Sequence, residues 1–252
     1  MIIKSLQAVT LIIFLFCSVS SYSQSRISKL VYKKKNNIDV ASKKKNKAME
    51  MFLKETFAHM KKVEYVLLFN DKASSFKRVR KMRNDLDKKL LSVKVSEVLG
   101  GGEGIYYTER KTKKSYHQTE FESELYLIEI DKKLDWNLTQ EKKKIGKYVC
   151  YKATTEDTSI GSSGSVLKKK IIAWYTPEIP FGYGPLKYHG LPGLILELEN
   201  DQVIYYTKEI QLHLTDKIDI EKPKKGIRLT RTEFDQTMMG LAKDLRKRHP
   251  RN

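Results

Sequence analysis

One stretch of this 252-residue chain restricts its fold more than any other, the segment from Pro177 to Gly193. It holds four of the six prolines and four of the thirteen glycines. Proline fixes φ and glycine releases it, so a segment this dense in both residues follows one irregular path. Leu194–Glu199 follows at once and alternates apolar and acidic residues. The pattern predicts a turn that leads into a strand, whose leucines enter the core while Glu197 and Glu199 face water.

Short segments with a period of two, separated by turn residues, recur along most of the chain. We expect strands at residues 27–32, 63–69, 74–81, 105–110, 115–121, 124–130, 145–155, 168–175, 193–199 and 203–214. Asn200-Asp201 lies between the last two, which predicts a hairpin. The expected fold class is therefore mainly β (α+β): a curved antiparallel sheet meander with one or two helices packed on it, of which a half-barrel is one form.

Two segments predict helices. Residues 42–60 carry an apolar stripe from Met49 to Met60 at helical spacing, with Ser42 as the N-cap. The second helix begins with Thr230-Arg231-Thr232-Glu233, which fits a capping box. Between the predicted elements we expect a loop over residues 84–98 and turns at Gly100–Gly104 and Lys142–Lys144.

The N-terminus has the layout of a secretory signal peptide. Lys4 precedes a short apolar run, Ala8–Cys17, and Ser21-Tyr22-Ser23 then offers small residues for cleavage. The run is shorter than the roughly 20 residues that a membrane span needs. We therefore expect residues 1–23 to be removed and residues 24–252 to form a single exported domain, in the periplasm or outside the cell.

The formal net charge is +19, and lysine supplies most of the cations. Nucleic-acid readers rely on arginine forks and a recognisable motif, and the lysine runs here are scattered without base-stacking aromatic residues. We expect no nucleic-acid partner. Such runs are usually solvated faces, and the alternative is a weak attraction to an anionic membrane surface or a glycolipid.

Without the signal peptide, Cys150 is the one remaining cysteine. It alternates within the apolar run Tyr148–Tyr151, which favours a buried and inert thiol. The alternative is a thiol–imidazole pair of Cys150 with His189. The histidines lack metal-ligand spacing, and neither a cysteine pair nor an aspartate-rich loop is present. We expect no catalytic residue, no metal and no cofactor.

The motifs around the proline-rich segment resemble those of a known family. Residues 190–195 read GLPGLI, AWYTPEIP stands upstream at 173–180, and KYVCYKATT occupies residues 147–155. These motifs resemble the GLPGLI family of exported Bacteroidota proteins. The resemblance implies an envelope or secreted protein of unknown biochemistry, here a single GLPGLI-type domain with a basic C-terminal helix, and it transfers no catalytic residue. The Gly/Ser loop and lysine insert after residue 155 depart from the usual shorter spacing.

Residues 177–193, the signature loop, set aromatic side chains among rigid turns. Such a loop either caps the core or forms a binding surface. Our hypothesis is a non-enzymatic exported cell-envelope protein that binds a protein or lipid partner through this loop. The alternative is a thiol or hydrolytic enzyme that uses Cys150 and His189. The candidate binding residues are Trp174, Tyr175, Pro180, Tyr183, Gly184, Pro185, Tyr188, Gly190, Leu191, Pro192 and Gly193.

Overall fold

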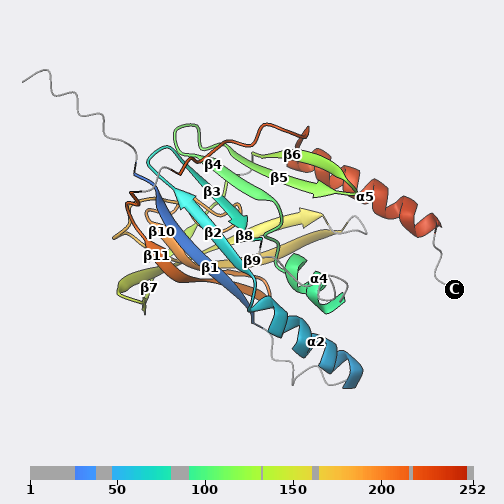
Figure 1. Ribbon diagram of the computed structural model, residues 1–252, viewed down its shortest axis with the longest axis horizontal. Coiled ribbons are helices and arrows are strands. Elements are labelled where there is room, and N and C mark those ends of the chain that lie inside the picture. Colours follow the sequence, from blue (N-terminus) through green and yellow to red (C-terminus); the bar gives the residue numbers. More distant parts are fainter. Residues whose placement is uncertain are drawn as a thin grey trace, which may run out of the picture.

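The computed structural model describes residues 26–37, 47–80, 91–131, 133–160, 165–215 and 218–248. The predicted signal peptide, the Ser42 cap and most of the predicted Gly/Ser loop lie outside these residues. Within them the chain forms a twelve-stranded sheet and three helices (Figure 1). None of these described helices is long and apolar enough to span a membrane.

The strands are β1 Ser28–Asn36, β2 Glu64–Phe69, β3 Ala73–Arg78, β4 Ile105–Glu109, β5 Ser115–Phe121, β6 Glu124–Ile130, β7 Asn137–Ile145, β8 Tyr148–Ile160, β9 Val166–Thr176, β10 Leu194–Asn200, β11 Val203–Gln211 and β12 Ile227–Thr230. The helices are α2 Lys47–Met60, α4 Leu91–Val98 and α5 Arg231–Arg248.

The strand order is β12-β6-β5-β4-β3-β2-β1-β11-β10-β9-β8-β7. Strands β2 to β6 form one meander and β7 to β11 form another, and β1 joins them by pairing with β2 and β11. All neighbours are antiparallel except β12 and β6, which are parallel. The predicted antiparallel meander is confirmed, including the hairpin of β10 and β11. The short parallel strand β12 was not predicted.

The sheet is strongly curved. The hydroxyl of Tyr188 donates to Asp157 on β8, while the ring of the next residue, His189, is hydrogen-bonded to Ser115 on β5. Eight strand spacings separate β5 from β8 in the sheet, which is about 38 Å if the sheet were flat. Two adjacent residues can reach both strands only because the sheet bends around them. The predicted curvature is therefore confirmed, and the signature loop lies on the concave face.

The core fills this concave face. Alternation along β2 directs Tyr65, Leu67 and Phe69 into it, and Phe69 meets the rings of Phe181 and Tyr183 from the signature loop. The buried residues that form this core come from strands of both meanders and from the loop: Leu30, Tyr32, Tyr65, Leu67, Phe76, Ala153, Ile171, Ala173, Tyr183, Tyr188, Leu194, Leu196, Leu198 and Tyr205, with others.

Two predicted irregular segments are regular. Helix α4 occupies the second half of the predicted loop at 84–98, and it buries Ser92, Val93 and Ser96. Small polar residues line much of that buried face, so the sequence lacks the apolar stripe that predicts a helix. The predicted turn at Lys142–Lys144 is part of β7. This strand lies at the edge of the sheet, where exposed lysines are tolerated and block further pairing.

Both predicted helices are present, with a difference at α2. Its buried residues are Thr56, Phe57 and Met60, all toward its C-terminal end, whereas Met49 is 55% exposed. The prediction that Met49 faces the core was wrong, because the buried residues of α2, which contacts β1 and α4, all lie in its last turns. The capping box at α5 is confirmed: the backbone N–H of Thr230 donates to Glu233, and the N–H of Glu233 donates back to the Thr230 hydroxyl.

The strand after the signature loop, β10, buries the three predicted leucines and one further residue. Leu194, Leu196 and Leu198 are fully buried, as expected. Ile195 is also fully buried, because the pairing shifts between Ile195 and Glu197 and the loop covers the strand. Glu197 is half-buried and forms an ion pair with Lys143, 2.6 Å between the charged atoms.

Replacing Leu196 by alanine empties a fully buried site. We expect Leu196→Ala to lower the free energy of unfolding by about 2–5 kcal/mol, measured by urea denaturation. The matched control is Leu138→Ala on edge strand β7, where the side chain is 51% exposed, and its expected cost is below about 0.5 kcal/mol apart from strand propensity. Equal losses for the two variants would contradict the register of β10.

Candidate functional site

The signature loop is held by backbone hydrogen bonds along its whole length. The amides of Gly190, Leu194 and Ile195 donate to the carbonyls of Gly182, Ile179 and Tyr183, at 2.8, 3.0 and 2.9 Å. Gly190 has φ +91°, which favours glycine, and a Cβ on Gly193 would collide with the carbonyl oxygen of Thr176. The conformation therefore depends on glycine at these two positions. The loop is an ordered layer on the sheet.

Most of the predicted binding residues are internal. Those that are buried are Tyr175, Tyr183, Gly184, Pro185, Tyr188, Leu191 and Gly193. Trp174 is half-buried, and Lys143 lies 4.2 Å above its ring. Pro180, Gly190 and Pro192 are exposed. The aromatic side chains thus fill the concave face, while two prolines and a glycine remain at the surface with the half-buried Phe181.

A polar bridge links the loop to both halves of the sheet. Lys187 Nζ lies 2.8 Å from Asp157, whose carboxylate also accepts from the Tyr188 hydroxyl at 3.1 Å. His189 Nε2 lies 2.9 Å from the Ser115 hydroxyl, and the carbonyl of His189 accepts from Trp136 at 2.9 Å. Burial raises the pKa of Tyr188, and the nearby carboxylate raises it further. These buried and half-buried polar groups satisfy one another, so the bridge stabilises the curvature.

The Ser115–His189 contact was not predicted. A serine next to a histidine is the first requirement of a nucleophilic hydrolase. Ser115, however, is 1% exposed, and its hydroxyl also lies 3.0 Å from that of Thr108. Burial lowers the pKa of His189. The buried Ser115 and the half-buried His189 are thus part of the polar bridge.

Cys150 is fully buried, as predicted. Burial raises the pKa of its thiol to about 11, although nearby Lys143 opposes the rise. A reactive cysteine needs the opposite shift, because the thiolate is the nucleophile. Among the described residues no hydrogen bond joins Cys150 to His189, whose ring is bonded to Ser115. No group of three or more potential metal ligands occurs in the described part of the chain.

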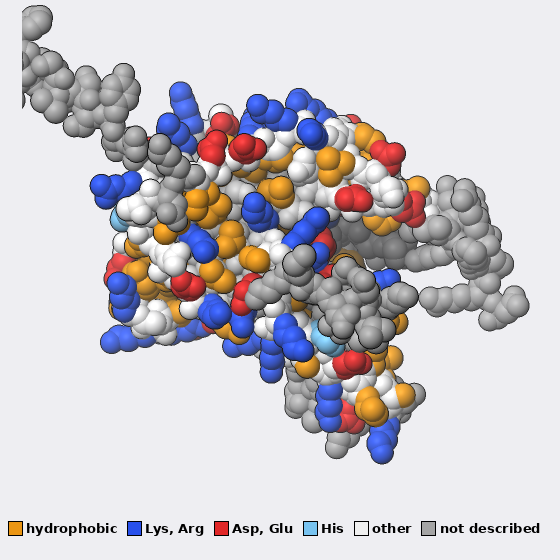
Figure 2. All heavy atoms as spheres, viewed as in Figure 1, with side chains coloured by type: hydrophobic (Ala, Val, Ile, Leu, Met, Phe, Trp, Pro, Cys, Tyr) orange, Lys and Arg blue, Asp and Glu red, His pale blue; other side chains and the backbone are white. Residues whose placement is uncertain are grey.

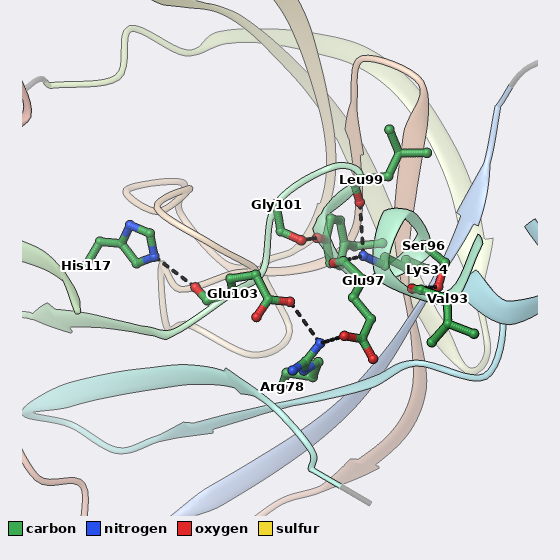
Figure 3. A network of polar contacts seen from close by, with 10 residues as sticks. Lys34, Arg78, Val93, Ser96, Glu97, Leu99, Gly101, Glu103 and His117 are labelled. Atoms are coloured by element: carbon green, nitrogen blue, oxygen red, sulfur yellow. Dashed lines mark hydrogen bonds and ion pairs between the residues drawn. The ribbon is translucent and has the colours of Figure 1, made fainter. Parts of the chain in front are cut away.

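A second buried cluster surrounds Lys34 of β1 (Figure 3). Lys34 belongs to a lysine run that the sequence predicts to be solvated. Its side chain is fully buried, and Nζ donates to the carbonyls of Glu97 and Leu99 at 2.8 and 2.9 Å. These carbonyls lie at and just after the end of α4, where a cation is favourable. Lys34 therefore acts as a C-terminal cap for a helix more than sixty positions away in the sequence.

An ion-pair network extends this cluster. Arg78 Nη1 lies 2.9 Å from carboxylate oxygens of both Glu97 and Glu103. His117 Nε2 is hydrogen-bonded to the carbonyl of Glu103 at 2.8 Å, and burial lowers the pKa of this histidine to about 4. Burial lowers the pKa of Lys34 to about 7, partly offset by Glu103 and Glu97, with Arg78 adding to the decrease.

The turn at Gly100–Gly104 joins the cluster to the core. Four of its glycines have positive φ. The carbonyls of Gly100 and Gly101 accept from the buried Tyr205 hydroxyl at 3.1 and 2.7 Å, and a Cβ on Gly102 would lie 2.5 Å from the ring of Tyr65. The predicted turn is confirmed, and its glycines serve close packing against tyrosines.

Comparisons with known proteins support the fold and give little on activity. Residues 163–197 match a family described as "Protein of unknown function (Porph_ging)". This segment covers the signature loop, and membership of the GLPGLI family stays a prediction. No curated protein matches the chain.

Two solved structures of PNGF-II are similar in fold. In the C2 crystal form the identity is 13%, the match covers 86% of this chain and 33% of that chain, and the TM-score is 0.50. In the P21 form the values are 14%, 86%, 34% and 0.51. The chain spans about a third of the length of these PNGF-II chains. At this identity the likeness shows a shared fold alone.

Removing the amine of Lys34 should change how stability depends on pH. The pKa of Lys34 is about 7 in the folded protein, against the ordinary value of 10.5 that applies to the unfolded chain. Between these values the unfolded chain binds more protons, so the free energy of unfolding rises with pH, by at most about 1.4 kcal/mol per pH unit from this group. We expect urea denaturation between about pH 7 and pH 9 to show this rise in the wild type, and a smaller rise in Lys34→Met. Lys35→Met, which alters an exposed neighbour, should keep the wild-type slope. Identical slopes for all three proteins would contradict the buried amine.

Proposed function

We propose that this chain is a non-enzymatic, exported protein of the cell envelope, which binds a protein or lipid partner at the exposed rim of its signature loop. The rim consists of Pro180, Phe181, Gly190 and Pro192. The location rests on the signal-peptide pattern and on the resemblance to exported proteins. The segment that matches a family of unknown function, residues 163–197, includes the rim.

The observation that carries the proposal is the way the rim is supported. The hydrogen bond from Gly190 to Gly182 holds the two turns of the loop together, so Phe181 and Pro192 belong to one surface. Beneath it, the ring of Phe181 packs on Phe69, and Arg110 lies 5.5 Å above that ring. A surface fixed in this way loses little conformational entropy when a partner binds.

The composition of the rim also favours binding. Prolines have no backbone donor to desolvate and few conformations to lose. An aromatic ring beside a guanidinium offers both apolar contact and a cation. These properties suit a protein surface or a lipid headgroup region.

The alternative of a thiol or hydrolytic enzyme has less support. The raised pKa of Cys150 keeps its thiol protonated at neutral pH. His189 is engaged with Ser115, which is buried. Neither arrangement offers an accessible nucleophile next to a base.

The proposal is tested by placing a photo-crosslinking amino acid at Pro180 or at Pro192 in the full chain, produced in a Bacteroidota host. Both positions are exposed, so the substitutions should leave the fold intact. We expect irradiation to give protein or lipid adducts, separated by gel electrophoresis and mass spectrometry, several times more abundant than those from a control position at the exposed Glu120. Equal adduct formation at all three positions would contradict a binding role for the rim.

A further inference from the structure

A groove of about 740 Å³ lies on the convex face of the sheet, opposite to the core. Side chains alternate along β2, so Val66 faces away from the buried Tyr65 and Leu67. The strand register places Val31 beside Val66, Val66 beside Lys77, and Lys77 beside Ile105. These residues form one row across β1, β2, β3 and β4, and all four line the groove.

The floor of this groove is apolar. Val31, Val66 and Ile105 are half-buried, and Val79, just after β3, is 37% exposed. Figure 2 shows hydrophobic side chains exposed among lysines and arginines on the face that carries β1 and β2 in Figure 1. Apolar surface that remains in contact with water gains free energy when another apolar group covers it.

The rim of the groove carries unbalanced positive charge. Two of its three carboxylates are engaged in ion pairs, Glu64 with Lys33 and Lys208, and Glu103 with Arg78. The third, Glu209, accepts a hydrogen bond from Gln211. In contrast, Lys29, Lys77 and Arg80 form no ion pair with an acidic residue in the described part of the chain. Lys77 is exposed and stands in the middle of the apolar row. An anion with an apolar tail would match both features.

We propose that this convex groove binds a single anionic lipid, with an acyl chain on the valine and isoleucine floor and the phosphate against Lys77 and Arg80. A hydrophilic polyanion would leave the floor exposed, and an uncharged hydrocarbon would leave the cations unmatched. The groove lies on the opposite face from the signature loop. The inference therefore goes beyond the proposed function, and either can fail without the other.

The test uses palmitoyl-lysophosphatidylglycerol as the probe, below its micelle concentration, with the purified full chain and isothermal titration calorimetry. Two comparison ligands separate the contribution of the negative charge from that of the acyl chain. Palmitoyl-lysophosphatidylcholine has the same chain without the net negative charge, and glycerol 3-phosphate has the phosphate without the chain. We expect the anionic lipid to bind at least about tenfold more tightly than either.

Charge reversal at the centre of the row identifies the site. Lys77→Glu should weaken binding of the anionic lipid by about tenfold or more. Lys94→Glu, on an exposed position of α4, makes the same charge change elsewhere and should leave the affinity unchanged. Val66→Thr keeps the side-chain shape, reduces the apolar floor, and should weaken binding less than Lys77→Glu does. Thermal denaturation of each variant checks that the fold is kept.

Four results would overturn the proposal: no binding by the wild-type chain, equal affinity for the zwitterionic lipid, equal affinity for glycerol 3-phosphate, or equal effects of Lys77→Glu and Lys94→Glu. The crosslinking experiment at the signature-loop rim gives a result that does not depend on lipid binding in the groove. Adducts at the rim without lipid in the groove would leave the proposed function intact and remove this inference alone.

Discussion

Two adjacent residues of the signature loop bridge the two halves of the curved sheet across its concave face. Tyr188 is bonded to Asp157 on β8, and His189 is bonded to Ser115 on β5. These bonds add to the pairing of β1 with its two neighbours and to the packing of Tyr65 on Tyr205, which also join the two meanders. With these bonds, the loop closes the concave side and buries its own aromatic residues. The density of proline and glycine in residues 177–193 follows from this role, because the loop must present both residues at a fixed distance.

Burying polar groups costs desolvation free energy. The structure offsets this cost because the buried groups form hydrogen bonds and ion pairs with one another. An isolated buried charge is strongly unfavourable. Asp157 meets Lys187 and Tyr188, and Lys34 meets two carbonyls at the end of α4. Each arrangement joins segments that are distant in the chain. The bonded groups therefore specify which elements meet, while the apolar core supplies most of the stabilising burial.

The sequence predicted those structural features that depend on residues close to one another in the chain. The hairpin of β10 and β11, the buried Cys150 and the capping box at Thr230 each depend on residues within a few positions of one another. The antiparallel sheet was also predictable, because most strands alternate clearly. Helix α4 was missed, since its buried face contains Ser92 and Ser96 and its C-terminal cap comes from a strand far upstream. Long-range polar pairs have no signature in a single sequence.

The sequence predicted where the candidate site lies, but not which of its side chains are exposed. The signature loop is where the sequence put it, yet Tyr183 and Tyr188 are core residues, and the exposed part is the small rim around Pro180 and Pro192. The alternation of aromatic residues with proline could not separate these outcomes, because aromatic side chains suit a core and a binding surface equally.

An ordered signature loop must be held as firmly as the sheet beneath it. Native-state hydrogen exchange at the amides of Gly190, Leu194 and Ile195 measures this directly, since each donates to a carbonyl within the loop. The predicted result is protection equal to that of core amides later in β10, at Leu196 and beyond, with exchange only through global unfolding. Exchange of these amides at the rate of an unprotected surface loop, while the β10 core stays protected, would contradict the account.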